Sequence, residues 1–346
     1  MISTQKKHLF AVVGFIATLL GSTLAMNLGA LKIQAAPVDV SVSAVNPHSW
    51  QNVQLLRTLR GHTDWVNCVA ISPDGQTLVS GSRDNTIKIW NLASGKVLAT
   101  LRGHSEAIYS LAISPDGQTL VSGSRDNTIK VWNLASGRLL ATLRGHSDPI
   151  YSLAISPDGK ILASGSGDNT IKIWNLETDQ EIFTLSGHTE AVSSVAISPD
   201  GQTLASGGHD NKIKIWNLAT GELIRTLKWH TNWVSSVAIS PDGQTLVSGS
   251  FDKTVKVWKL ATGEKIRQLK GHLDLVYSVA ISPDGQSIAS GSQDKTIKIW
   301  NLATGQEIRT LTGYSNSVYS VVIGSDNQTI ASAGFDELIT LWKVSP

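Results

Sequence analysis

Apolar and small polar residues alternate in short runs along most of this chain, and one arrangement of them keeps returning. The stretch LVSGSRDNTIKIW at 78–90 reappears at 120–132, 162–174, 204–216, 246–258, 288–300 and, more weakly, at 330–342. Its closing residue is Trp90, Trp132, Trp174, Trp216, Trp258, Trp300 or Trp342, so the spacing is always 42 residues. Seven copies without insertion or deletion predict seven copies of one structural unit.

Within each unit the pattern predicts four short strands. In the first unit they read WVNCVAIS, QTLVSGS, TIKIW and KVLATL. A Pro-Asp-Gly turn at 73–75 and an Ala-Ser-Gly turn at 93–95 separate two of the pairs, with glycine supplying the positive φ. β-branched residues and short alternations favour strands over helices. A period in the low forties is typical of β-propeller blades, so we expect an all-β, seven-bladed propeller with four-stranded antiparallel blades.

The two ends of the repeat array are complementary. Residues 53–59 resemble the fourth strand of a unit but precede the first unit, whereas the last unit stops shortly after Trp342 and lacks that strand. We therefore expect the N-terminal strand to complete the last blade and close the ring over 53–346. Closure removes the open sheet edges that would otherwise template aggregation.

The N-terminal segment has a different composition. Lys6 and Lys7 precede an apolar run from Leu9 to Met26 that is long enough, as a helix, to approach the width of a bilayer. Residues 1–36 are thus predicted to be either a signal peptide cleaved after Ala25 or an uncleaved membrane anchor, and both alternatives stay open. Either one places the propeller outside the cytoplasm, with membrane contact only through this segment. Residues 37–52 are predicted to be a linker.

Charge and cysteine content exclude two classes of protein. The chain has 29 basic and 27 acidic residues, and three of the lysines lie in residues 1–36, so the repeat array is nearly neutral. A nearly neutral body argues against nucleic-acid binding, which needs many basic residues on one face. The single cysteine, Cys68, excludes an internal disulfide framework. It takes the place of Ser110, Ser152 and Ser194 in other units, so we expect a small packed residue.

A His, Ser, Asp and Trp set occurs at fixed offsets in the first six units. The sets are His62, Ser80, Asp84, Trp90; His104, Ser122, Asp126, Trp132; His146, Ser164, Asp168, Trp174; His188, Ser206, Asp210, Trp216; His230, Ser248, Asp252, Trp258; and His272, Ser290, Asp294, Trp300. The composition suggests a catalytic triad, but a triad occurs once in a protein and needs an oxyanion hole. Because the indole N–H only donates and the carboxylate only accepts, the set predicts a structural hydrogen-bond chain.

These motifs resemble the WD-repeat family, with Gly-His near the start of a unit and Asp six residues before Trp. The resemblance covers about residues 53–342 and implies a platform for partner proteins or peptides, with the four-residue sets as structural tetrads. The residue after Trp is Asn or Lys and never Asp, a position outside the tetrad. Unit five has Trp229-His230 in place of Gly-His, and unit seven has Gly313-Tyr314, which removes the histidine.

Lysines recur two residues before tryptophan in the first six units. They are Lys88, Lys130, Lys172, Lys214, Lys256 and Lys298. We expect their stems to cover the outer part of each blade while the ammonium groups stay in water.

Function is expected where the copies differ. Three positions change freely, three and five residues after His and directly before Asp, and all three belong to loops at one end of the channel. The candidate partner-binding residues there are Trp65, Arg83, Tyr109, Arg125, Tyr151, His209, Trp233, Phe251, Tyr277, Tyr319 and Phe335. Rings and arginines are enriched at interface centres, whereas drift would favour small polar residues. We expect a discontinuous apolar collar, cationic at Arg83 and Arg125 and shallow over units three and four.

These observations predict a monomeric, non-enzymatic scaffold that binds a protein or peptide partner with apolar anchors and an acidic residue near units one and two. No Gly-rich phosphate loop or zinc-spaced Cys/His set appears in the sequence, so no cofactor or metal is expected. The alternative is a propeller hydrolase or lyase with its site at the channel mouth. Its candidate acids and bases would be His209, Asp64, Glu106, Asp148, Glu190 and Asp274.

Overall fold

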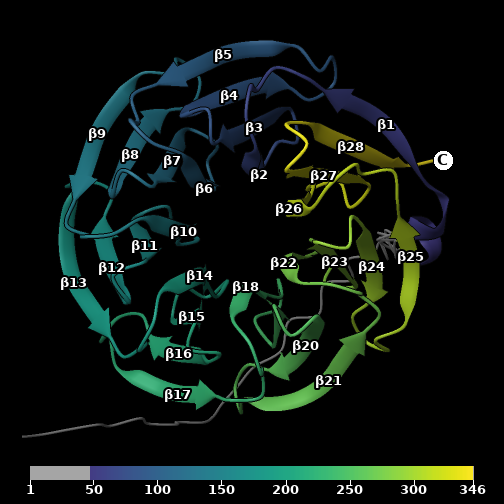
Figure 1. Cartoon of the computed structure of the whole chain (residues 1–346). Helices are drawn as coiled ribbons and strands as arrows, with labels where there is room; N and C mark the ends of the chain where they lie inside the picture. The colour runs from purple at the N-terminus through teal and green to yellow at the C-terminus, as the bar shows by residue number, and fades with distance from the viewer. Residues whose placement is uncertain (1–46, 346) are drawn as a thin grey trace, which may run out of the picture. The chain divides into compact units, whose positions relative to one another are not determined.

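The structure is a computed structural model, and it describes residues 47–345. Seven four-stranded antiparallel sheets stand around a central channel as the blades of a propeller (Figure 1). In each blade the first strand lies next to the channel and the fourth forms the rim. The predicted fold class, with seven blades of four strands, is therefore confirmed.

The strands of the blades follow one another in chain order. Blades one to three contain β2 (Val66–Ile71), β3 (Thr77–Ser82), β4 (Thr86–Asn91) and β5 (Val97–Arg102); β6 (Ile108–Ile113), β7 (Thr119–Ser124), β8 (Thr128–Asn133) and β9 (Leu139–Arg144); and β10 (Ile150–Ile155), β11 (Ile161–Ser166), β12 (Thr170–Asn175) and β13 (Gln180–Ser186). Blades four and five contain β14 (Val192–Ile197), β15 (Thr203–Gly208), β16 (Ile213–Asn217) and β17 (Leu223–Leu227); and β18 (Val234–Ile239), β19 (Thr245–Ser250), β20 (Thr254–Lys259) and β21 (Glu264–Lys270). Blade six contains β22 (Val276–Ile281), β23 (Ser287–Ser292), β24 (Ile297–Asn301) and β25 (Glu307–Leu311).

Blade seven combines both ends of the chain. It contains β26 (Val318–Ile323), β27 (Thr329–Gly334), β28 (Ile339–Val344) and, as its outer strand, β1 (Val53–Leu59). β1 pairs antiparallel with β28, with Val53 opposite Val344 and Leu59 opposite Ile339. The predicted closure of the ring by the N-terminal strand is confirmed.

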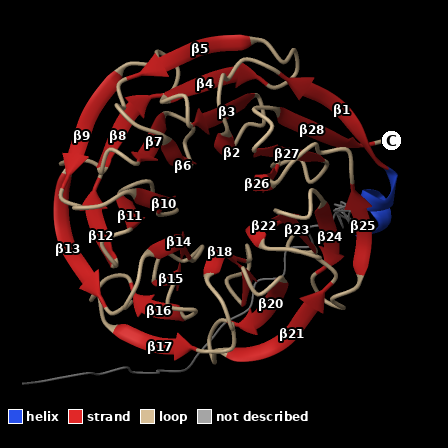
Figure 2. Cartoon of the chain, in the orientation of Figure 1, coloured by secondary structure: helices blue, strands red, loops and turns tan. Residues whose placement is uncertain are grey.

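The folded unit begins earlier than the sequence pattern indicates. Pro47–Asn52 form a short 3₁₀ helix, η1, drawn in blue at the rim in Figure 2. The indole of Trp50 is 2% exposed and packs with Val53, Leu311 and Trp342. The last six residues of the predicted linker 37–52 are therefore part of the propeller unit, because burial of this indole fixes them against the ring.

The predicted signal peptide or anchor at 1–36 lies outside the described residues. Among residues 47–345 there is no helix with the length and apolar character needed to cross a bilayer.

Serines on the inner strands join most neighbouring blades. Ser110 of β6 accepts a hydrogen bond from the backbone N–H of Leu153 in the next blade, at 3.0 Å, and six of the seven seams have such a bond. The exception in the described chain is the seam between blades one and two, where Cys68 occupies the serine position. The buried thiol points to the Gly81 carbonyl instead, and burial raises its pKa to about 12. Cys68 is thus the small packed residue that the sequence predicts.

A candidate binding face at the channel mouth

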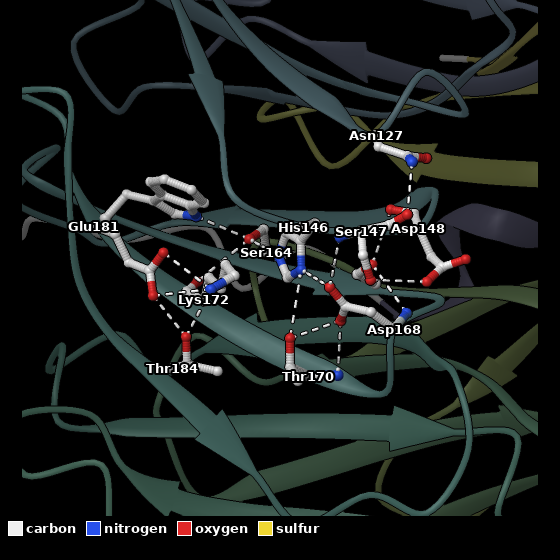
Figure 3. Close-up of polar contacts among 12 residues, drawn as sticks. Asn127, His146, Ser147, Asp148, Ser164, Asp168, Thr170, Lys172, Glu181 and Thr184 are labelled. Atoms are coloured by element: carbon white, nitrogen blue, oxygen red, sulfur yellow. Dashed lines mark hydrogen bonds and ion pairs between the residues drawn. The ribbon is translucent and has the colours of Figure 1, made fainter.

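The four-residue sets form hydrogen-bond chains inside the blades, as blade three illustrates (Figure 3). Trp174 Nε1 donates to Ser164 Oγ at 2.9 Å, and Ser164 Oγ lies 2.8 Å from His146 Nε2. His146 Nδ1 lies 2.7 Å from Asp168 Oδ2, so the ionised carboxylate receives the ring N–H. Since the indole can only donate, the chain runs from tryptophan through serine and histidine to aspartate.

Equivalent chains occur in each of the first six blades. His Nδ1 lies 2.7 to 3.0 Å from the aspartate in every case. Burial alone would raise the pKa of Asp168, but the bonds from His146 and Thr170 outweigh it and hold the pKa well below its usual range. Ser164 has no exposed surface, as is true of the equivalent serine in the other five sets. A nucleophile must reach its substrate, so this geometry fits a structural chain and not a triad.

Blade seven lacks the histidine, and Tyr314 makes a different set of hydrogen bonds in its place. The Tyr314 hydroxyl accepts the indole N–H of Trp342 at 2.6 Å and lies 2.5 Å from Ser332 Oγ. In the other blades the tryptophan donates to the serine directly. The longer phenol reaches between the two partners, and burial raises its pKa above the ordinary value. The Tyr314 hydroxyl therefore links β27 to β28, a link that the tryptophan and the serine make directly in the other blades.

Lys130, Lys214 and Lys256 are buried, contrary to the expected lysine arrangement, and blade five departs from it furthest. Lys256 is 3% exposed, and its ammonium group lies 2.8 Å from Asp252 Oδ2 and 3.0 Å from His230 Nδ1. The expectation of a solvated ammonium group is wrong here, because blade five has Lys265 on the outer strand, where blade three has Glu181. Lys265 instead lies over the Trp229 ring, 4.3 Å from its centroid.

Comparison with blade three explains why the Lys256 side chain points into the blade. There Lys172 lies 2.9 Å from Glu181 and 2.8 Å from Thr184, so it points toward the rim. In blade five the corresponding residues are Lys265 and Gln268, and a like charge opposes the outward position. Burial lowers the pKa of Lys256, Asp252 counteracts this, and Lys265 lowers the pKa further.

The variable positions converge on one cavity at the channel mouth. Its volume is about 480 Å³, and residues from all seven blades line it. The lining consists of Trp65, Asn67, Arg83, Tyr109, Arg125, Tyr151, Ser193, His209, Trp233, Ser235, Phe251, Tyr277 and Tyr319. Ten of the eleven candidate partner-binding residues are among them. Phe335 is not, because it lies against Trp65, with ring centroids 3.9 Å apart.

The rings around this cavity form an almost continuous arc. Starting from Trp65, neighbouring centroids lie 3.9 to 6.3 Å apart through Phe335, Tyr319, Tyr277, Phe251, Trp233, His209, Tyr151 and Tyr109. The arc of rings continues across blades three and four, because His209 stacks on Trp233 at 3.9 Å while lying 6.1 Å from Tyr151. The shallow depth expected for this sector stays a prediction.

Charge is unevenly distributed around the arc. Arg83 lies over the Trp65 ring at 4.3 Å and pairs weakly with Asp64 at 3.8 Å. The guanidinium of Arg125 has no hydrogen-bond or ion-pair partner among residues 47–345. In that part of the chain no carboxylate lines the cavity, so the candidate acids of the enzyme alternative stand outside it.

Sequence comparison places these features in a known family. The family model described as the first beta-propeller domain of WDR3 matches residues 38–210 and again residues 169–344. The two matches together cover most of the chain and all seven blades. This chain belongs to the WD-repeat β-propeller family.

Individual WD-repeat relatives match over short stretches. Pleiotropic regulator 1 of Homo sapiens is 38% identical over 76 residues, which is 22% of this chain and 15% of that protein. Small ribosomal subunit protein RACK1 of Medicago sativa is 51% identical over 45 residues, 13% of this chain and 14% of that protein. Pre-mRNA-splicing factor PRP46 of Saccharomyces cerevisiae is 49% identical over 45 residues, 13% of this chain and 10% of that protein. The matched stretches thus span 15% or less of these relatives.

Three residues of this WD-repeat propeller's cavity are absent from the sequence-based candidates. Asn67, Ser193 and Ser235 take the place of ring-bearing residues five positions after the histidine. The Asn67 amide donates to the Ile108 carbonyl at 2.8 Å, and both serines donate to carbonyls of the following blade. They could have been identified from the sequence, because they hold the same variable position as the tyrosines of the other blades. Small polar residues there join blades and leave the cavity open.

Proposed function

We propose that this protein is a non-enzymatic scaffold whose aromatic-lined cavity binds a segment of a partner protein or peptide. The observation that supports this most directly is the convergence of variable positions. Copies that agree in strands, turns and tetrads differ at residues that meet around one cavity of about 480 Å³. A duplicated unit keeps what folding needs, so differences concentrated on one surface favour a role in recognition.

The chemistry of the lining fits recognition of a polypeptide segment. Trp233 is 40% exposed, and the rings beside it present a large apolar surface that is already ordered by ring-to-ring contacts. Tyrosine, tryptophan and arginine supply most of the binding energy at interface centres. Ligand cavities commonly have volumes of about 300 to 1,000 Å³, so this one is large enough for one or two anchoring side chains.

The relatives support the same class of function. Their names describe a regulator, a ribosomal subunit protein and a splicing factor, and none of these three is named for a reaction. We place the action of this protein outside the cytoplasm, on the strength of the apolar run in residues 9–26 behind Lys6 and Lys7. Fractionation tests that location: an intact chain starting at Met1 in a soluble cytoplasmic pool contradicts it.

The binding role is tested by affinity enrichment with the full chain as bait. The test variant carries Trp65→Ala and Trp233→Ala, which remove two rings of the arc. The control carries Lys96→Ala and Arg138→Ala, two exposed residues at the turns that lead to the outer strands. All baits must show the same unfolding midpoint. Partners retained by wild type and control but lost with the test variant support the proposal, whereas a partner retained equally by all three contradicts it.

A further inference from the structure

The arc of rings is interrupted once. Ring contacts cross six of the seven seams, and the described rings make no such contact between Trp65 of blade one and Tyr109 of blade two. At this seam the Asn67 amide bonds to the Ile108 carbonyl where four other blades have a tyrosine, and Trp65 contacts the rings of blade seven instead of blade two. The gap in the arc of rings is therefore held in place by a hydrogen bond between the two blades.

Both arginines of the cavity flank this gap. Arg83 precedes the tetrad aspartate of blade one, and Arg125 holds the same position in blade two. Arg83 is held in place by the Trp65 ring and is partly neutralised by Asp64. Arg125 has neither arrangement within residues 47–345. The cavity thus has a cationic gap in an otherwise apolar wall, with one guanidinium left unpaired.

The charge balance selects the kind of anion. Arg83 already has Asp64 as a weak ion-pair partner at 3.8 Å, whereas Arg125 has no ion-pair partner in the described residues, so Arg125 is the guanidinium open to a ligand. A carboxylate carries one negative charge and matches the planar guanidinium with two parallel hydrogen bonds. A phosphate dianion would bring a second charge into a wall of rings, where burying an unpaired charge is costly.

The positions of the arginines and the rings around the cavity indicate how a ligand would orient its carboxylate. Residues of all seven blades line the cavity, so a ligand enters it from the face of the propeller on which these loops lie. Trp233 and Phe251 of blade five lie on the wall formed by the opposite half of the ring, with centroids 5.2 Å apart. A ligand that spans the cavity meets the arginines at one end and these rings at the other.

We infer that the cavity binds an apolar residue that bears a free carboxylate, such as the C-terminal residue of a polypeptide, with that carboxylate on Arg125 in the gap between Trp65 and Tyr109. This inference rests on the proposed function and assigns the ligand chemistry of the same site. The shared chemistry is an apolar group with one carboxylate, which a free aromatic acid also offers.

The test compares three probes by isothermal titration calorimetry against the full chain. They are the pentapeptide Gly-Ser-Ala-Leu-Phe with a free C-terminus, the same peptide with an amidated C-terminus, and N-acetylphenylalanine. The free-acid peptide should bind at least about tenfold more tightly than the amide, as expected for a charge-assisted bond. In Arg125→Gln that preference should disappear, whereas Arg138→Gln, an exposed arginine in the same repeat, should retain it.

The outcomes separate the inference from the proposed function. If both peptides bind equally and lose affinity in Trp233→Ala, the carboxylate inference is overturned while the binding role of the cavity stands. If neither peptide binds at millimolar concentration, the inference is also overturned, and affinity enrichment decides the proposed function separately. Binding of N-acetylphenylalanine as tight as that of the free-acid peptide supports the inference and identifies a small acid as the source of the ligand.

Discussion

The imidazole of His209 lies flat on the indole of Trp233, with centroids 3.9 Å apart and planes 5° from parallel. His209 comes from the loop between β15 and β16 of blade four and Trp233 from the loop that leads into β18 of blade five, so the stack seals the seam between these blades at the channel mouth. Burial lowers the pKa of His209, although Glu190 and Asp210 act in the opposite direction.

This stack predicts how the pKa of His209 responds to mutation. In Trp233→Ala the imidazole should become hydrated, and its pKa should rise toward the ordinary value of 6.5. Titration of the ring C–H signals by NMR measures the change. Phe251→Leu is the control, since Phe251 contacts Trp233 but has no ring contact with His209. An unchanged pKa in Trp233→Ala would show that the indole does not cause the shift.

The seam between blades one and two should gain stability from a serine. In Cys68→Ser the new hydroxyl can accept the Leu111 N–H, as Ser110 accepts that of Leu153 in the next seam at 3.0 Å. We expect the free energy of unfolding to rise by about 1 kcal/mol, a typical net value for one hydrogen bond. Chemical denaturation measures this, and Ser152→Ala should lower stability by a similar amount because it removes the equivalent bond. A less stable Cys68→Ser variant contradicts this account.

Tyr314 should behave as a structural replacement for histidine. Tyr314→Phe removes the acceptor of the Trp342 N–H and should destabilise the protein by about 1 to 3 kcal/mol, since a buried donor loses its partner. Tyr319→Phe is the matched control, because the Tyr319 hydroxyl makes no hydrogen bond in the described residues. Thermal unfolding compares the two, and equal losses would argue against the bridge between Trp342 and Ser332.

The tetrad aspartates predict destabilisation in acid. Burial alone would raise the pKa of Asp126, but bonds from His104 and Thr128 lower it below the ordinary 3.8. A carboxyl whose pKa is lower in the folded state stabilises the fold above its unfolded pKa, and this contribution is lost as pH falls below about 4. Stability measured from pH 6 to pH 2 should therefore fall steeply below pH 4.

A variant isolates the contribution of one tetrad. Asp126→Ala should be less stable at neutral pH by about 1 to 3 kcal/mol, because His104 loses its acceptor. The variant should also lose less stability than wild type between pH 4 and pH 2. If Asp126→Ala is as stable as the wild type at neutral pH, the structural role assigned to the tetrad is ruled out.

The buried lysine of blade five should turn outward when its repulsion is removed. Lys265→Glu gives Lys256 the carboxylate that Lys172 has in Glu181, at 2.9 Å. We expect the pKa of Lys256 to rise, since burial and Lys265 both lower it in the wild type. Lysine ammonium titration by NMR measures this, with Lys270→Glu as a control on the same strand. If the pKa stays low in Lys265→Glu, burial alone keeps Lys256 in place.

The sequence by itself determined the architecture, because the same local pattern of strands and turns occurs seven times along the chain. A tryptophan every 42 residues, glycine at turns that need positive φ and a missing last strand are enough to predict the blades and their closure. Donor and acceptor types within one unit also predict the tetrad, since His146, Ser164 and Trp174 can be satisfied in only a few ways. The variable positions identified most of the residues that meet at the cavity.

Only the tertiary structure decided how side chains of different units meet. The position of Lys256 depends on Lys265 across the strand pair, and the continuity of the arc depends on His209 reaching Trp233 in the next blade. Trp50 is buried because the ring offers it a site beside Leu311, far away in sequence. Such contacts depend on side-chain length, rotamer and neighbouring charge at single positions. A period of 42 residues predicts which backbones are adjacent, but the packing between neighbouring blades decides which side chains fill the space between them.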